Sequence, residues 1–149
     1  MSHINMLSSH RRKARHFGLQ ALYQWYVTGT DHLRIEEEFR IDNDFSHTDT
    51  DFFQAILRGV VHDSEALDAL FEPSLDRNLD DLDPIERSLL RMGAYELRDR
   101  LDVPYKVVIN EAVSLAKKFG ASESHKYING VLDKLSRDLR KVERVSDCK

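Results

Sequence analysis

The sequence predicts an all-α protein, a compact bundle of about seven helices. Three observations predict this fold class. Apolar residues recur at helical spacing in almost every segment, no segment alternates with period two for long enough to indicate a strand, and only three prolines and six glycines interrupt the 149 residues. A chain of this length can bury a core of its own, so we expect one domain over residues 1–149, with flexible ends at 1–8 and 141–149.

The first half of the chain is expected to contain four helices. The first runs from about Ser9 to Val27, and a short second helix covers residues 33–39. Residues 42–50 are polar and are expected to form a loop. Residues 52–61 read as a buried helix, and residues 67–75 as another helix with a proline inside it.

The second half has clearer helix boundaries. The segment Asp83–Glu86 offers a cap acceptor, a proline at the first helical position and a glutamate placed to complete a capping box. The next helix begins after Pro104 and ends at Gly120, which we expect to adopt a left-handed conformation. Ser122 or Ser124 is expected to cap the last helix.

Cysteine usage and hydropathy place the protein in the cytoplasm. Cys148 is the only cysteine, so a disulfide within the chain is excluded and an oxidising compartment is not indicated. No basic segment followed by an apolar run resembles a secretion signal, and no apolar run approaches the ~20 residues that span a bilayer. We therefore expect a cytoplasmic protein without membrane contacts.

The net charge of −4 conceals a segregation of charge along the chain. Residues 1–30 carry +4 with no acid, residues 31–83 carry −12, residues 84–105 are neutral, and residues 106–149 carry +4. Two basic ends around an acidic middle indicate a nucleic-acid face and an opposite acidic face. Solvated charge that happens to cluster is the alternative.

The first predicted helix has a basic and aromatic face opposite its apolar one. Guanidinium groups pair with phosphates and stack on bases, and tyrosine adds a stacking surface that tolerates any base. Single-stranded RNA needs both, because its unpaired bases must be held and stacked. The alternative is a solvated basic end with Tyr23 buried against a neighbouring helix. The face is lined by Arg12, His16, Leu19 and Tyr23 and flanked by Arg15 and Tyr26.

The last predicted helix has a second polar face, which Lys126, Gly130 and Lys134 share. Tyr127 lies between this group and the apolar stripe. A glycine inside a helix costs ~1 kcal/mol relative to alanine, so Gly130 indicates either close packing or a ligand backbone that comes near. Packing is the favoured explanation.

Signals for metal binding or catalysis are weak. The seven histidines show no spacing typical of a zinc site, and the chain has neither a glycine-rich phosphate loop nor a nucleophile elbow. The acidic run Asp80–Asp83 is better explained as a negative cap on the helix that follows than as a metal site. We therefore expect no metal and no cofactor.

Three blocks of sequence are more specific than any single motif. Residues 11–25 contain R-R-x-A-R followed by Q-A-L-Y-x-W, and residues 102–112 read D-V-P-x-x-V-x-I-N-E-A. Residues 117–133 contain K-x-F-G and then K-Y-I-N-G-V-L-D. These blocks resemble, in order, those of the NusB family of transcription antitermination factors, where phenylalanine is common at the position of Tyr127. The resemblance covers the chain from about Arg11 to Leu139.

The resemblance implies two packed helical subdomains and no enzymatic activity. It also implies binding of boxA-type single-stranded RNA together with NusE, a small-subunit ribosomal protein, within an antitermination complex on RNA polymerase. Glu86 matches a family position that faces NusE, and the acidic middle of the chain suits a basic ribosomal protein. Asn110 and Asn129 are expected to form internal hydrogen bonds. The RNA-binding residues that the resemblance implies are Arg11, Arg12, Lys13, Arg15, Tyr23, Glu123, Lys126 and Tyr127.

Two other functions stay open. A NusB-like domain also occurs ahead of an RNA cytosine methyltransferase, where it targets an enzyme to RNA, but this chain has no glycine motif for the cofactor of that enzyme. An adaptor that binds only proteins is the second alternative, and the basic and aromatic face of the first helix argues against it. The sequence does not decide whether the chain forms a homodimer.

Overall fold

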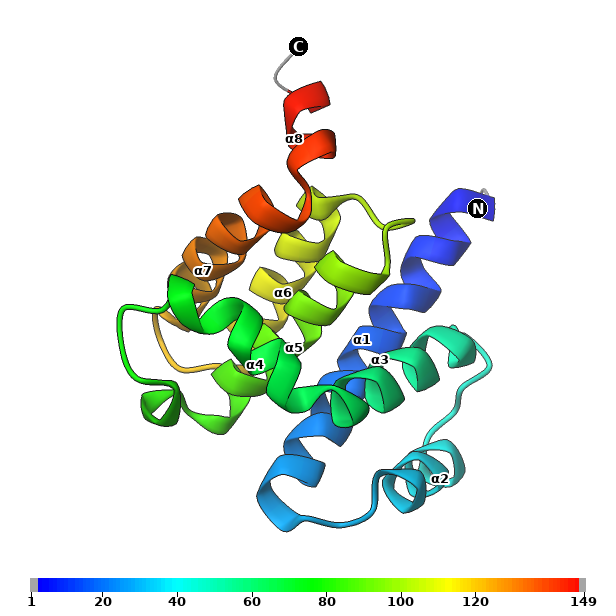
Figure 1. Cartoon of the computed structure of the whole chain (residues 1–149). Coiled ribbons are helices and arrows are strands. Elements are labelled where there is room, and N and C mark those ends of the chain that lie inside the picture. Colours follow the sequence, from blue (N-terminus) through cyan, green and yellow to red (C-terminus); the bar gives the residue numbers. More distant parts are fainter. Residues whose placement is uncertain (1–2, 148–149) are drawn as a thin grey trace. The chain divides into compact units, whose positions relative to one another are not determined.

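The computed structural model describes the backbone of residues 3–147, and every regular element in that range is helical (Figure 1). The all-α prediction is therefore confirmed, and Cys148 lies outside the described residues. The described chain forms two compact units that divide between His62 and Asp63. No helix in the range combines the length and the apolar character needed to cross a membrane. The elements are α1 (His3–Thr28), α2 (His32–Asp42), α3 (Thr50–His62), α4 (Ser64–Phe71), the 3₁₀-helices η1 (Glu72–Ser74) and η2 (Leu79–Asp81), α5 (Pro84–Asp99), α6 (Tyr105–Phe119), α7 (Ser124–Leu139) and α8 (Lys141–Asp147).

The first unit consists of α1, α2 and α3 around a cluster of phenylalanines. Phe17 of α1 stacks on Phe45 with the ring centroids 4.8 Å apart, and Phe45 meets Phe53 of α3 edge-on at 5.1 Å. Each such pair adds about 0.5–1.5 kcal/mol to the stabilisation from buried area. Asp31 caps α2 by accepting a hydrogen bond from the backbone N–H of Leu33. The cluster fixes α1, which carries the basic residues, against α3.

In the second unit, α5 contacts α4, α6 and α7 (Figure 1). Its side chains Leu89, Leu90 and Leu97 are fully buried. Gly93 allows α7 to approach closely, because a Cβ atom at this position would lie 2.7 Å from Leu132 Cδ2. The helical spacing of apolar residues in this part of the sequence thus corresponds to a central helix that packs against other helices on several sides.

The predicted capping box at the start of α5 is confirmed. The Asp83 carboxylate accepts a hydrogen bond from the Glu86 N–H at 2.8 Å, and Glu86 Oε1 accepts one from the Asp83 N–H at 3.3 Å. Asp80 lies in η2, 3.5 Å from Nη1 of Arg87. The acidic run therefore serves the start of α5, as expected.

Two predicted helix boundaries are wrong. The first helix begins at His3 and not near Ser9. The helix predicted over residues 67–75 is divided into α4, which ends at Phe71, and η1. The division follows from Pro73, which has no N–H to continue an α-helical hydrogen-bond ladder.

The turn into α7 also differs from the prediction. Gly120 is extended, at φ −87° and ψ 170°, whereas Glu123 adopts the left-handed conformation with φ 74°. Neither Ser122 nor Ser124 caps α7 with its side chain. The Ser124 hydroxyl instead donates a hydrogen bond to Glu86 Oε2 at 3.2 Å. A non-glycine residue in this conformation costs about 1–2 kcal/mol, so the turn is locally strained at Glu123.

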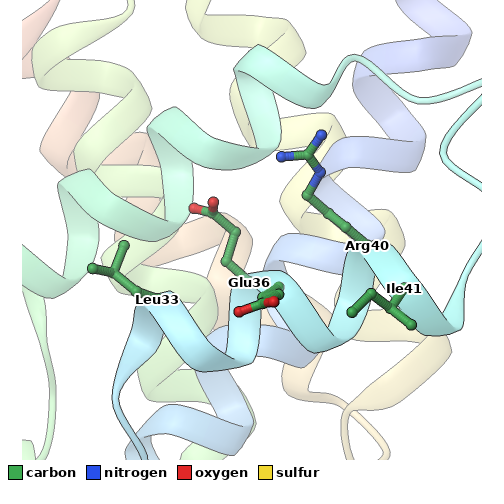
Figure 2. Close-up of a pocket in the computed structure, with 5 residues that line it drawn as sticks. Leu33, Glu36, Arg40 and Ile41 are labelled. Atoms are coloured by element: carbon green, nitrogen blue, oxygen red, sulfur yellow. The ribbon is translucent and has the colours of Figure 1, made fainter.

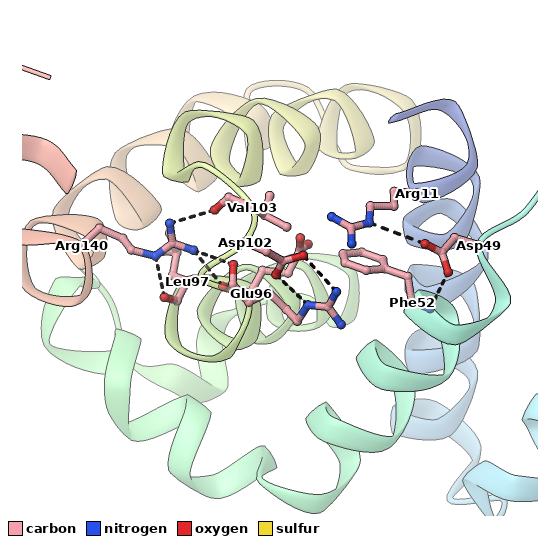
Figure 3. A network of polar contacts seen from close by, with 9 residues as sticks. Arg11, Asp49, Phe52, Glu96, Leu97, Asp102, Val103 and Arg140 are labelled. Carbon is pink, nitrogen blue, oxygen red and sulfur yellow. Dashed lines mark hydrogen bonds and ion pairs between the residues drawn. The ribbon is translucent and has the colours of Figure 1, made fainter. Parts of the chain in front are cut away.

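A buried arginine organises the C-terminal part of the second unit (Figure 3). Arg140 is 4% exposed, and it donates hydrogen bonds to four backbone carbonyl groups at the end of α5 and in the turn that follows it. Glu143 of α8 accepts a hydrogen bond from Arg140 Nη1 at 2.6 Å. Residues 141–147 thus have regular structure, while the flexibility expected of both ends stays a prediction. The carbonyl groups that Arg140 contacts are those of Glu96, Leu97, Arg100 and Val103.

Candidate nucleic-acid interface

The predicted RNA-binding residues fall into two groups, one in each unit. The first group lies along α1, and the second surrounds the start of α7. The members of each group lie within one unit, and those of the first group are spread along several turns of α1. The α1 group is Arg11, Arg12, Lys13, Arg15 and Tyr23, and the α7 group is Glu123, Lys126 and Tyr127.

Three members of the α1 group lie on the surface. Arg12 and Lys13 are exposed, and Tyr23 is 40% exposed. Tyr26 and Val27, one turn further along α1, are also exposed and extend an apolar surface from Tyr23. The alternative that buries Tyr23 in the core is therefore wrong. These side chains can offer charge and a stacking surface to a ligand.

The other two members of the α1 group pack against α3. The guanidinium carbons of Arg11 and Arg15 lie 4.7 Å and 4.9 Å from the centroid of the Phe52 ring. Arg15 is only 3% exposed, and Leu19, one turn beyond it, is fully buried. The expectation that Arg15 and Leu19 belong to the exposed face is wrong, because α1 buries more than the single apolar face that its periodicity indicates.

Asp49 fixes the position of Arg11 (Figure 3). Its backbone N–H donates a hydrogen bond to the carbonyl of His10 at 3.0 Å, and its carboxylate accepts one from the Phe52 N–H at 3.0 Å. The same carboxylate lies 3.6 Å from Arg11 Nε. Sequence reasoning missed Asp49 and Phe52 because both come from a segment far along the chain from α1.

In the second unit, Tyr127 is covered by an arginine. The guanidinium carbon of Arg77 lies 3.9 Å from the centroid of the Tyr127 ring, and Arg77 Nε donates a hydrogen bond to Asp76 at 2.9 Å. Tyr127 is half-buried, and this burial raises the pKa of its hydroxyl. Arg77 lies in the acidic middle of the sequence, where no pattern marked it as part of a site.

Lys126 and Gly130 of α7 face solvent, and two asparagines are more open than expected. Lys126 Nζ pairs with Glu123 at 2.7 Å, and both side chains are well exposed. An added Cβ at Gly130 would meet no atom within 4 Å, so packing does not explain this glycine. Asn110 and Asn129 are exposed, and the expectation that they are internal residues is wrong.

Glu86 is 7% exposed, although a partner contact would require its carboxylate to be accessible. Its two oxygens bind the Asp83 N–H and the Ser124 hydroxyl. The expected exposure of Glu86 is thus wrong, because the capping box turns the side chain back toward its own helix start and Ser124 covers it.

A hollow in the first unit lies along α2 (Figure 2). Glu36, one of its lining residues, pairs with Arg58 at 2.8 Å. The exposed apolar side chains of the hollow are Leu33 and Ile41. None of the predicted RNA-binding residues lines it. The lining residues are Leu33, Glu36, Glu37, Arg40 and Ile41.

Comparison with known proteins identifies relatives of the chain. The model of the NusB family matches residues 12–137. The transcription antitermination protein NusB of Hahella chejuensis is 56% identical over 133 residues, which cover 89% of either chain. The match of the family model includes Arg12, Lys13 and Arg15 of α1 and the start of α7.

Two solved structures are similar to most of the chain. NusB of T. maritima matches with a TM-score of 0.76 at 30% identity, covering 85% of this chain and 90% of that one. A crystal structure of antitermination factors NusB and NusE in complex with dsRNA matches with a TM-score of 0.71 at 27% identity, covering 87% of this chain and 97% of that one. With a family model that spans most of its length and a relative at 56% identity, the chain belongs to the NusB family.

Proposed function

We propose that this protein is a transcription antitermination factor that binds boxA-type single-stranded RNA together with NusE, within an antitermination complex on RNA polymerase. The observation that carries the proposal is the exposed combination of Arg12, Lys13 and Tyr23 on α1 of a NusB family member. Two cations and an aromatic ring along one helix can hold phosphates and stack an unpaired base. We also propose a cytoplasmic location, since the protein would act where RNA is transcribed.

The family is non-enzymatic, and we propose a binding role for every site residue. Arg11 and Arg15 of α1 pack on Phe52 of α3 and would support the RNA-binding surface. Arg12 and Lys13 would contact phosphates directly. Lys126 and Glu123 would lie near the RNA at the start of α7. The relative from Hahella chejuensis bears the name of an antitermination protein, which favours this function over the methyltransferase module.

The proposed protein partner is NusE, which stands beside NusB in one of the related structures. The twelve excess negative charges of residues 31–83 suit a basic ribosomal protein. Glu86 keeps its proposed place near this partner. A direct ion pair would require its carboxylate to leave the Asp83 N–H and the Ser124 hydroxyl, so we propose that it shapes the contact by holding the start of α5.

Anisotropy of a labelled boxA-type RNA, titrated with the protein alone and with NusE, tests the function. We expect binding that NusE strengthens and that prefers the single strand to a duplex of the same sequence. Arg12→Ala with Lys13→Ala should reduce the slope of log affinity against log salt by about 1.4, since each single-strand phosphate contact adds about 0.7. Arg34→Ala, which removes an exposed arginine from α2, is the control. An RNA affinity that is absent with and without NusE would contradict the proposal.

A further inference from the structure

Arg77 presents a flat, supported cation beside the start of α7. It lies between η1 and η2, in a stretch without helix, and its side chain is 39% exposed. Tyr127 lies under its guanidinium at 3.9 Å, and Asp76 binds its Nε edge at 2.9 Å. An exposed arginine usually samples many rotamers, whereas these two contacts define the plane of this guanidinium.

The two contacts also determine what the arginine can offer a ligand. The hydrogen bond that Arg77 donates to the Asp76 carboxylate raises the pKa of Arg77, so the side chain stays charged. The adjacent carboxylate offsets that charge, which weakens the attraction for a phosphate. This weaker attraction for a phosphate does not affect stacking on the flat face of the guanidinium. A guanidinium held over an aromatic ring can stack a base on its outer face.

We propose that the guanidinium of Arg77 stacks an unpaired RNA base, with Tyr127 as the residue that positions it. This inference rests on the proposed RNA-binding function. It assigns Tyr127 an indirect part in RNA binding that agrees with its partial burial, since the base would contact the arginine and not the phenol ring. Lys126, the exposed residue next to Tyr127 in the first turn of α7, pairs with Glu123 and could also hold a neighbouring phosphate.

Stacking and phosphate pairing predict different results for the same variants. If Arg77 stacks a base, Arg77→Ala should weaken RNA binding at least about fivefold and leave the salt slope nearly unchanged. Arg77→Lys keeps the charge but loses the plane, so it should bind as weakly as Arg77→Ala. If Arg77 pairs with a phosphate, Arg77→Ala should lower the slope by about 0.7, and Arg77→Lys should bind nearly as well as the unchanged protein.

A double-mutant cycle tests the positioning role of Tyr127. Tyr127→Leu keeps an apolar side chain without the aromatic ring, and it should weaken RNA binding about as much as Arg77→Ala. The double variant should then bind no more weakly than either single variant, because both changes remove one stacking surface. Independent, additive losses would contradict the positioning role. Melting temperatures of the same samples show whether Tyr127→Leu is folded, and Arg77→Ala tests the stacking without changing the core.

The experiment uses the full chain with the labelled single-stranded RNA, and again with 2-aminopurine in place of single bases to detect stacking. Arg34→Ala is the matched control, since Arg34 pairs with Glu38 at 3.0 Å as Arg77 does with Asp76 and is 73% exposed. The expected result is a loss of affinity and of 2-aminopurine quenching in Arg77→Ala but not in Arg34→Ala.

Unchanged RNA binding by Arg77→Ala, when Arg12→Ala binds weakly, would overturn the inference and leave the proposed function intact. A loss of NusE binding alone would assign Arg77 to the protein partner and overturn it too. No RNA binding by the unchanged protein would overturn both proposals.

Discussion

The carboxylate of Glu143 in α8 accepts a hydrogen bond from the backbone N–H of Tyr105, the first residue of α6, at 2.8 Å. The residue before α6 is Pro104, which provides no side-chain cap. A residue 38 positions away therefore does the work of an N-cap, and its negative charge lies at the positive end of the helix dipole. The same carboxylate pairs with the buried Arg140, so one side chain joins α6, α7 and α8.

Replacing Glu143 with alanine should lower the free energy of unfolding by about 1–3 kcal/mol, because α6 loses its cap and Arg140 loses a partner. Chemical denaturation measures the change. Glu65→Ala is the control, since Glu65 is an exposed glutamate in the first turn of α4. Equal stability of the two variants would show that the Glu143 contact contributes nothing.

Asp68 of α4 and Arg91 of α5 form a buried pair that should be the most sensitive charged contact of the second unit. Arg91 donates two hydrogen bonds to the Asp68 carboxylate, both at 2.8 Å, and Arg87 adds a third at 2.9 Å. Asp68→Ala leaves buried guanidinium charge without its partner and should destabilise the fold by about 3–5 kcal/mol. Glu38→Ala breaks an exposed pair on α2 and should cost less than about 0.5 kcal/mol. Chemical denaturation of both variants compares the two losses.

Arg12 and Arg15 should behave as different kinds of arginine, although they lie three residues apart. Arg15 is buried over Phe52, so Arg15→Ala should lower the melting temperature by several degrees. Arg12→Ala should leave the melting temperature nearly unchanged and weaken RNA binding, because exposed charge contributes little to folding. Calorimetry and RNA anisotropy on the same samples compare them, and identical profiles for the two variants would refute the distinction.

Tyr23 is proposed as a stacking surface, and its 40% exposure makes the test direct. Tyr23→Ala should weaken RNA binding by about fivefold or more, since stacking on an aromatic side chain is worth about 1–3 kcal/mol per base. The melting temperature should shift only slightly. A variant that melts many degrees lower but binds RNA normally when folded would show that Tyr23 serves the fold.

The sequence predicted best what depends on neighbours along the chain. The helical spacing of apolar residues and the capping box of Asp83 and Glu86 are local, and the structure confirms both. The burial of Arg15 could not be predicted, because it depends on Phe52, which the fold brings to α1 from α3. The stack of Arg77 on Tyr127 joins residues 50 positions apart and has no local signature.

Backbone conformation at a single residue was also beyond the sequence. Gly120 was the natural candidate for a left-handed residue, since glycine adopts positive φ without strain. The chain instead places Glu123 there, and it does so with Ser124 hydrogen-bonded to Glu86 across the unit. The hydrogen bond from Ser124 to Glu86 fixes where α7 begins, and Glu123 then adopts the left-handed conformation.

The two helical glycines of the second unit, Gly93 and Gly130, provide the last test, because their surroundings differ and their chemistry does not. Gly93→Ala should destabilise the second unit, since its Cβ would lie 2.7 Å from Leu132 Cδ2 and the fully buried Leu132 side chain would have to move. Gly130→Ala meets nothing within 4 Å and should raise the free energy of unfolding by about 0.5–1 kcal/mol, the difference in helix propensity.

A site that is stabilised by alanine but carries glycine is expected where a ligand backbone comes near. We therefore predict that Gly130→Ala, while more stable in denaturant, binds RNA or NusE more weakly in the anisotropy titration. A variant that is more stable and binds both as the unchanged protein does would remove the ligand explanation for Gly130.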